Sequence, residues 1–247
     1  MNGSLEEFRG FERTMIRARP ALESIELDGW VLRFAGGFTK RANSVNPHFG
    51  STQPATEKIA RCEALYGARG LPAIFRLTPF SQPADLDRTL ADAGYRLLDR
   101  SVVIAGAIRP TDGEVESVAF ATSEGWLDAF DRLRGLDEAA AGIHRRIVDA
   151  VDDERFFALV GRETEPIACG LGVCVEDTVV LFDLFVEESH RRRGHGAAVA
   201  SAILRRAIDR GARMALLQTH SENAIAQRLY RRFGLAVAYP YWYRIKP

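Results

Sequence analysis

Apolar residues recur at helical spacing at the start of the chain and again after its middle. Near the start they occupy one helical face at Leu5, Phe8, Phe11 and Met15. Ser4 followed by Glu7 resembles a capping box, in which each side chain satisfies a free backbone N–H of the first turn. Similar spacing around residues 126–133 and 143–151 predicts two further helices.

Short apolar runs bounded by turn residues predict the strands. The run WVLRF, residues 30–34, is followed by two glycines, and further strands are expected at 156–160, 167–175 and 179–186. In the strand 167–175 one face carries only small residues, Ala168, Gly170, Gly172 and Cys174. Two explanations stay open, the close packing of a helix or room for a ligand.

One order of elements occurs twice. The first unit is a strand at 43–46, a helix at 55–68, a strand at 73–77, a helix at 83–93 and a strand at 101–104. The second has corresponding elements at 179–186, 196–210, 215–218, 223–233 and 239–245. Gly70 and Gly94 are 24 positions apart, and Gly211 and Gly234 are 23 apart. We interpret this as a degenerate internal duplication; chance similarity of two α/β segments is the alternative.

A polar stretch, RPTDGEVE at 109–116, is typical of a linker between the two halves. It predicts two parts, residues 1–110 and residues 116–247. Apolar residues make up 47% of the chain, and 33 basic residues balance 33 acidic ones, so no global charge favours a nucleic acid or an anionic membrane. The three cysteines lack a CxxC pair and no apolar run reaches membrane length, so we expect a soluble, cytoplasmic protein without nucleic-acid or membrane partners.

The segment after the strand 179–186 contains Arg191-x-x-Gly194-x-Gly196 and leads into an amphipathic helix. A glycine-containing turn at a helix start presents unpaired N–H groups and the positive end of the helix dipole, which suit a pyrophosphate. The sequence has no G-K-[ST] of a P-loop and no third glycine of a dinucleotide fingerprint. The turn is therefore a candidate pyrophosphate site that fits neither of these nucleotide-binding motifs.

Both this turn and a later block resemble the GNAT (GCN5-related) N-acetyltransferases. The family's pattern Q/R-x-x-G-x-G/A falls on Arg191, Gly194 and Gly196. Its second pattern, N-x-x-A-x-x-L-Y-x-x-x-G-F, falls on Asn223, Ala226, Leu229, Tyr230 and Gly234, and only its last position differs, with Leu235 for Phe. The resemblance covers roughly the last 130 residues. Residues 1–110 lack the glycine loop, so they are expected to form a degenerate GNAT-like lobe, as in tandem relatives such as mycothiol synthase.

The resemblance implies the fold and the cofactor site. We expect an α/β (α+β) fold with a mixed, mostly antiparallel sheet flanked by helices and a second, smaller lobe of similar plan. Acetyl-CoA would pair with the backbone of Leu184, Phe185 and Val186, and its pyrophosphate would lie against Arg191, Arg192, Arg193, Gly194, His195, Gly196 and Ala197. Asn223 would contact it as well, although a helix N-cap explains this residue equally well. No metal is expected.

The resemblance also implies direct acetyl transfer to a primary amine on a small molecule or peptide. Tyr230 would protonate the departing thiolate, since a tyrosine with the ordinary pKa of ~10 carries its proton at neutral pH; core packing is the alternative. Asp183 and His220 are the candidate bases, with a chain of water as a further possibility. A non-catalytic acyl-CoA-binding regulatory module is the alternative function.

Overall fold

A single mixed sheet runs through both halves of the chain. The computed structural model describes residues 3–50, 52–109 and 118–246. Within them the strands lie in the order β1-β2-β3-β4-β11-β5-β10-β9-β8-β7-β6. In chain order these strands are β1 Glu23–Leu27, β2 Trp30–Phe34, β3 Val45–Asn46, β4 Ile74–Leu77, β5 Arg96–Ala107, β6 Val118–Phe120, β7 Glu154–Gly161, β8 Pro166–Val175, β9 Thr178–Val186, β10 Met214–His220 and β11 Ala236–Ile245.

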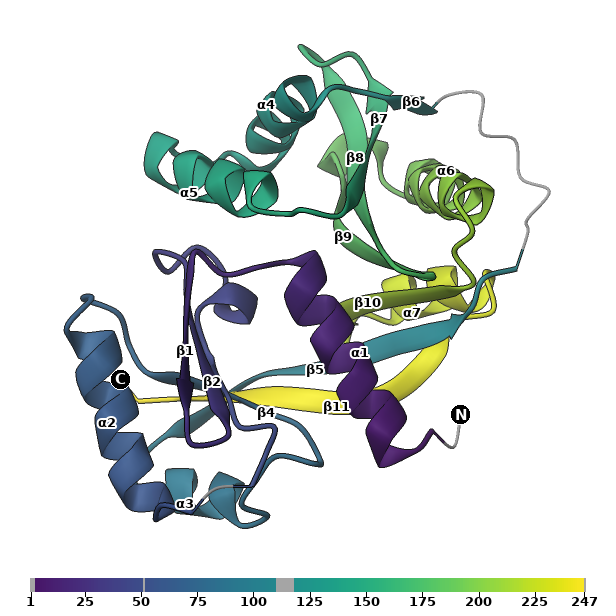
Figure 1. Cartoon of the computed structure of the whole chain (residues 1–247). Coiled ribbons are helices and arrows are strands. Elements are labelled where there is room, and N and C mark those ends of the chain that lie inside the picture. Colours follow the sequence, from purple (N-terminus) through teal and green to yellow (C-terminus); the bar gives the residue numbers. More distant parts are fainter. Residues whose placement is uncertain (1–2, 51, 110–117, 247) are drawn as a thin grey trace.

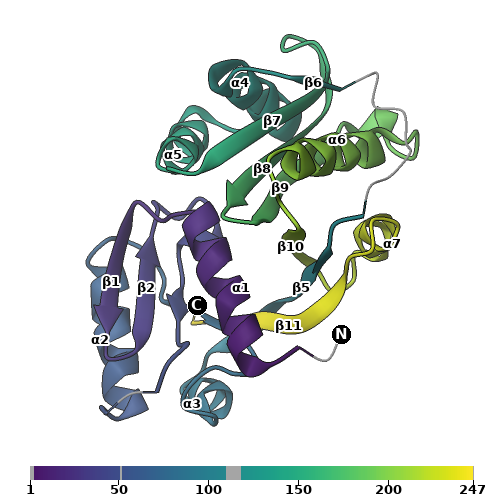
Figure 2. The same cartoon turned by 45° about the vertical axis from the view of Figure 1, so that its right-hand side comes forward.

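Helices flank both faces of this sheet (Figures 1 and 2). They are α1 Leu5–Ala18, α2 Ala55–Gly67, α3 Leu86–Asp92, α4 Ser123–Arg134, α5 Glu138–Asp149, α6 His195–Asp209 and α7 Ala224–Arg231, with the short 3-10 turns η1 Lys40–Ala42 and η2 Glu188–His190. The expected fold class is confirmed. The cap expected at the first helix is also present, because the Ser4 hydroxyl accepts the Glu7 N–H at 3.1 Å.

The two halves exchange their last strands. β5, from the first half, lies between β10 and β11, whereas β11, from the second half, lies between β4 and β5. Figure 1 shows β5 and β11 running side by side through the middle of the molecule. The strand order therefore reads alike from either side of the β11–β5 pair, with β3-β4 on one flank and β9-β10 on the other.

The repeated order of elements is present as expected. The β3–β4 and β9–β10 pairs are both parallel, which fits equivalent positions in two related units. The four glycines that follow the helices of these units all have positive φ: Gly70, Gly94, Gly211 and Gly234. The structure thus supports a duplication. The linker at 110–117 lies outside the described residues, and the division into two lobes stays a prediction.

The faces of the sheet carry separate apolar cores. α1 and α4 pack on one face, where Met15 and Trp126 belong to the same cluster as Phe182 of β9. α6 and α7 pack on the opposite face, where Val199 and Tyr230 belong to another cluster. Although α1 comes from the first half of the chain, it contacts β8 and β9 of the second half.

The face of β8 that carries only small residues packs against a helix. A β-carbon at Gly170 would lie 2.6 Å from Val199 Cγ1, and one at Gly172 would lie 2.4 Å from Ile203 Cγ2. Real β-carbons do not approach this closely, so these glycines allow α6 to lie against the sheet. Of the two explanations left open by the sequence, close packing of a helix is the one observed.

Candidate active site

β9 and β10 separate partway along their length. They pair in parallel from Met214–Leu217 against Thr178–Leu181, and beyond that point β10 keeps only its partner β5. The separation begins at a β-bulge in β9, where Asp183 and Leu184 together oppose Gly170, and Asp183 has φ of 51°. A bulge bends the strand that carries the extra residue. It therefore opens a gap in the sheet between residues 182–186 and 218–220.

Backbone donors of β9 point into this gap. The Glu187 N–H donates to Ile167 O on β8 at 2.9 Å. Because alternate residues of a strand direct their N–H groups to opposite sides, the Phe185 N–H also faces β8, and those of Val186 and Leu184 face the gap. Of the three residues expected to pair with a ligand, two have the required orientation, and the Phe185 N–H does not.

The glycine turn lies at the open end of the gap. η2 leads to Gly194, whose φ is 89°, and α6 begins at the next residue, His195. A β-carbon on Gly194 would meet no heavy atom within 4 Å, and one on Gly196 would lie 3.5 Å from both Leu184 and Val186 side chains. The first-turn N–H groups of a helix lack partners within the helix. The glycine turn therefore lies next to the strand residues that border the gap.

The three arginines of the turn are exposed. Arg191 bends back over the strand, where its Nε donates to Val186 O at 3.3 Å and its guanidinium lies 3.6 Å from Glu188. Arg192 adopts a left-handed conformation with φ of 63°. Residues 195 and 197 lie half-buried in the first turn of α6. This arrangement fits the pyrophosphate of an acyl-CoA.

Tyr230 lies on α7, on the same face of the sheet as α6. Only 5% of the residue is exposed, and burial raises the pKa of its phenol. A raised pKa keeps the proton on the oxygen at neutral pH, which a proton donor requires. Asn223 caps α7, with its side-chain oxygen accepting the Ala226 N–H at 3.0 Å. The structural explanation of Asn223 as an N-cap is thus observed.

Asp183 is tied into a buried network. Its carboxylate accepts two hydrogen bonds from Arg19, one of them at 3.2 Å, and lies 3.3 Å from His144 Nε2. Burial alone would raise the pKa of Asp183, but Arg19 and His144 outweigh it and hold this pKa well below its usual range. A carboxylate with so low a pKa is a weak base. The other candidate base, His220, is exposed at the end of β10, on the same face as Gln218 because strand faces alternate.

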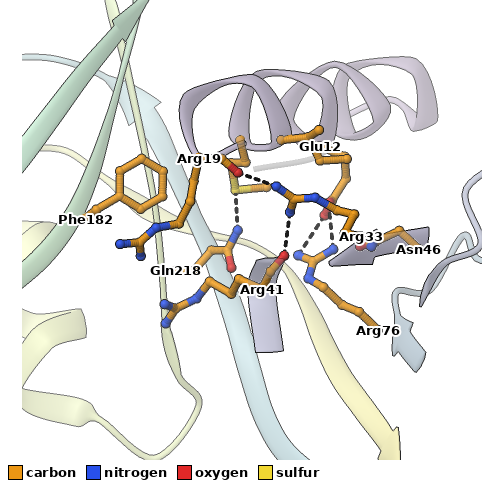
Figure 3. A pocket seen from close by; sticks show the side chains of 10 residues that line it. Glu12, Arg19, Arg33, Arg41, Asn46, Arg76, Phe182 and Gln218 are labelled. Carbon is orange, nitrogen blue, oxygen red and sulfur yellow. Dashed lines mark hydrogen bonds and ion pairs between the residues drawn. The ribbon is translucent and has the colours of Figure 1, made fainter. Parts of the chain in front are cut away.

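A cluster of arginines lies beside the gap, on the face of the sheet opposite Tyr230. It lines a narrow cavity together with Phe182 of β9 and Gln218 of β10, and it consists of Arg19, Arg33, Arg41 and Arg76 (Figure 3). All four come from the first half of the chain. Sequence reasoning missed them, although Arg33 in WVLRF and Arg76 in IFRL interrupt otherwise apolar strands. A charged residue inside such a strand was the available signal.

Comparison with known proteins identifies the family. The family described as "Probable histone acetyltransferase Rv0428c C-terminal" matches residues 6–244. The chain belongs to the GNAT superfamily. It is an N-acetyltransferase of the GNAT type, so the enzyme expectation is confirmed over the non-catalytic alternative. A Bacillus subtilis (strain 168) protein named Uncharacterized N-acetyltransferase YobR is 28% identical over 250 residues, which cover 98% of this chain and 100% of that protein.

Solved GNAT structures share the fold. A GCN5-related N-acetyltransferase from Kribbella flavida superposes with a TM-score of 0.71 at 16% identity, covering 100% of this chain and 97% of that one. A second one, from Sphaerobacter thermophilus, gives 0.59 at 18% identity over 78% of this chain and 67% of that one. A tandem GNAT protein from the clavulanic acid biosynthesis pathway gives 0.56 at 9% identity over 78% and 71%.

The first half of this GNAT protein has a carboxylate where the second half has its glycine turn. The turn before α2 corresponds to the turn before α6. There Asp28 accepts the N–H of Gln53 at 2.9 Å and that of Thr52 at 3.0 Å, and Lys58 lies 3.7 Å from the same carboxylate. An internal carboxylate thus engages the backbone N–H groups of this turn.

No helix within the described residues is long and apolar enough to cross a membrane. In the same residues there is no group of three or more His, Cys, Asp or Glu side chains arranged to hold a metal.

Proposed function

We propose that this protein transfers an acetyl group from acetyl-CoA to a primary amine. The observation that carries the proposal is the gap between β9 and β10, which ends at a glycine turn and a helix N-terminus. Strand-like pairing along the gap and an anion site at its end match the two parts of coenzyme A, an extended amide-containing arm and a pyrophosphate.

Each part of the site has an assigned task. Acetyl-CoA supplies an acyl group activated as a thioester. The N–H groups of Leu184 and Val186 bind the arm and polarise the thioester carbonyl, where negative charge develops during attack. Residues 191–197 hold the pyrophosphate through backbone N–H groups and the arginine charges, and Gly194 leaves room for its oxygens.

The reaction is a direct transfer. The amine nitrogen forms a bond to the acetyl carbon, the carbon–sulfur bond breaks, and Tyr230 gives its proton to the departing thiolate. The proton of the amine passes to a base or to water. We assign this step to His220 before Asp183, because the Asp183 carboxylate is held by Arg19 and His144 at a depressed pKa. The proposed setting is the cytoplasm.

The test is a thiol-release assay with acetyl-CoA and a panel of primary amines, with products identified by mass spectrometry. We expect amine-dependent thiol release and an N-acetylated product. Thiol release without any acetylated amine would reduce the activity to thioester hydrolysis. Absence of acetyl-CoA binding in calorimetry would refute the proposal altogether.

A further inference from the structure

The arginine cluster, Arg19, Arg33, Arg41 and Arg76, has more positive charge than its surroundings balance. Arg76 forms a bidentate ion pair with Glu12, at 2.6 and 3.0 Å, and Arg19 pairs with Asp183. Arg33 and Arg41 form no ion pair with a carboxylate among the residues that the structure describes. The Arg41 side chain is hydrogen-bonded to that of Tyr241 instead, and the four guanidinium groups share two carboxylates, Glu12 and Asp183, so positive charge is in excess in this largely buried region.

The neighbouring titratable groups do not supply the missing negative charge. His48 lies 3.9 Å from Glu12, and burial lowers its pKa to about 4, so it is neutral at pH 7. Burial raises the pKa of both Tyr239 and Tyr243, so these phenols keep their protons. Burial, with Arg76 and Arg19, lowers the pKa of Arg33 to about 10, which still leaves Arg33 charged at neutral pH.

Arg33 lines the cavity and has one donor without a partner. Only 4% of the residue is exposed, its terminal nitrogens donate to the Arg19 and Arg41 carbonyls, and its Nε has no partner (Figure 3). An unpaired buried donor on a charged group is costly. The cavity beside it has a volume of ≈ 10 Å³, about that required by one water molecule. It therefore holds about one water molecule, and a carboxylate would have to displace that water and shift the side chains around it.

The cavity lies next to the gap at which acetyl transfer is proposed to occur. Phe182 and Gln218 line it, and they flank the position where β9 and β10 begin to separate. If a second group of the acceptor molecule were held in the cavity, the amine of that molecule would reach the gap from the face opposite Tyr230. The donor and the acceptor would then meet through the gap in the sheet.

We propose that the arginine cluster binds a carboxylate carried by the acceptor, so that the preferred substrate is a small amino acid-like molecule with a primary amine and a carboxylate. This inference rests on the proposed acetyltransferase function. Arg33 and the partly exposed Arg41 supply the charge and the planar donors that suit a carboxylate. A lysine-rich peptide is disfavoured because it would bring further positive charge to the cluster.

The experiment compares free L-amino acids with the corresponding amino-acid amides, which keep the amine and lose the carboxylate charge. The amine of an amide is the less basic, so a larger fraction of it is unprotonated at neutral pH, and amine ionisation alone would favour the amide. We expect kcat/KM for the acids to exceed that for the amides by about 10- to 100-fold, the scale of a hydrogen bond to a charged group. Equal rates for both, or faster acetylation of a lysine-rich peptide, would overturn the proposal.

The test variant is Arg41→Gln, because Arg41 is partly exposed and its loss disturbs folding less than loss of Arg33. It should reduce the preference for acids to near unity, and Arg41→Lys should restore part of it. Arg155→Gln is the matched control: Arg155 is also half-buried and donates to a carbonyl, Val148 O at 2.8 Å, on β7 away from the cavity. A preference for acids that survives Arg41→Gln would assign carboxylate recognition elsewhere.

A binding measurement separates this inference from the proposed function. Amino acids should raise the melting temperature of the wild-type protein and not that of Arg41→Gln, whether or not any amine is acetylated. If no amine turns over but this stabilisation is seen, the proposed function fails and the carboxylate site stands. If sodium acetate or sodium chloride stabilises as strongly as every amino acid, and amino acids are not acetylated, the cluster is a structural anion site and the inference fails.

Discussion

Gly194 provides a sharp test of the pyrophosphate site because a matched control glycine lies at the other end of α6. Gly194 precedes α6 with φ of 89°, and Gly211 follows α6 with φ of 90°. A β-carbon at either position would meet no protein atom within 4 Å. A substitution at each glycine therefore has the same backbone strain and no steric clash with the protein.

The cost to folding should be equal at the two positions. A left-handed conformation costs a residue with a β-carbon about 1–2 kcal/mol. For a chain of this size that corresponds to a fall in melting temperature of about 2–8 °C. We expect Gly194→Ala and Gly211→Ala to melt alike within a few degrees, as measured by differential scanning calorimetry.

The effect on acetyl-CoA should differ strongly. In Gly194→Asp the new carboxylate lies against the pyrophosphate, and two unit charges about 4 Å apart repel by about 1 kcal/mol in water and about 4 kcal/mol near a protein surface. The dissociation constant should rise by between about 5-fold and nearly 1000-fold, whereas Gly211→Asp should leave it unchanged. The loss should shrink in 1 M salt, where the screening length falls to about 3 Å.

Titration calorimetry at low and high salt measures these constants directly. Equal acetyl-CoA affinity in folded Gly194→Asp and Gly211→Asp would show that the pyrophosphate does not lie at this turn. An equal loss in both variants would show that the effect is transmitted through helix stability, and it would refute the reasoning as well.

Three further outcomes are expected. Tyr230→Phe should lower turnover by about 10²–10⁴-fold with unchanged acetyl-CoA affinity, and the defect should shrink with acyl donors whose thiol leaves more easily; full turnover under chemistry-limited conditions would return Tyr230 to a packing role. Calorimetry should give one acetyl-CoA per chain, because Asp28 fills the equivalent position in the first half; a stoichiometry of two would contradict this. Asp183→Asn should cost about 3–5 kcal/mol at pH 7 by leaving Arg19 buried and unpaired, against less than about 1 kcal/mol for Asp128→Asn, the control in the exposed pair with Arg145.

The free energy of unfolding at acidic pH provides a second test of the Asp183 ion pair. Its folded pKa lies below the unfolded value of ~3.9, so the ion pair contributes fully above that value and the contribution is lost as pH falls towards the folded pKa. In Asp183→Asn the free energy of unfolding should therefore fall less steeply below about pH 4. Parallel acid unfolding curves for the variant and the wild type would contradict the depressed pKa.

Local patterns predicted most of the elements. The strand Trp30–Phe34 and the cap at Ser4 were found as expected, because an apolar run and a capping box depend on neighbouring residues alone. β1 and β6 were missed. β1, with the sequence ESIEL, is largely exposed at the edge of the sheet and has only two apolar residues, and the three residues of β6 are too few to form a pattern.

The exchange of β5 and β11 could not be predicted in the same way. Both strands were expected, but a strand's sequence does not specify which strand lies beside it when both neighbours present similar apolar faces. The same limit applies to the site. The glycine turn and Tyr230 belong to contiguous motifs, whereas the Arg19–Asp183 pair joins residues 164 positions apart and depends on where α1 crosses the sheet.

The exchanged strands and the positions of the charged residues explain what the first half contributes to the site, although it lacks a glycine loop of its own. Without β5, β10 would lack its partner along residues 214–220, and one side of the proposed acetyl-CoA gap would be unsupported. Without α1, Asp183 at the bulge would lose Arg19, and without β2 and β4 the cavity beside the gap would lose Arg33 and Arg76. The second half thus supplies the proposed donor site, and the first half supplies a supporting strand and the charged wall opposite it. The expected absence of a cofactor in the first half, where Asp28 accepts the N–H groups of Thr52 and Gln53 before α2, is compatible with both of these tasks, because neither depends on that turn.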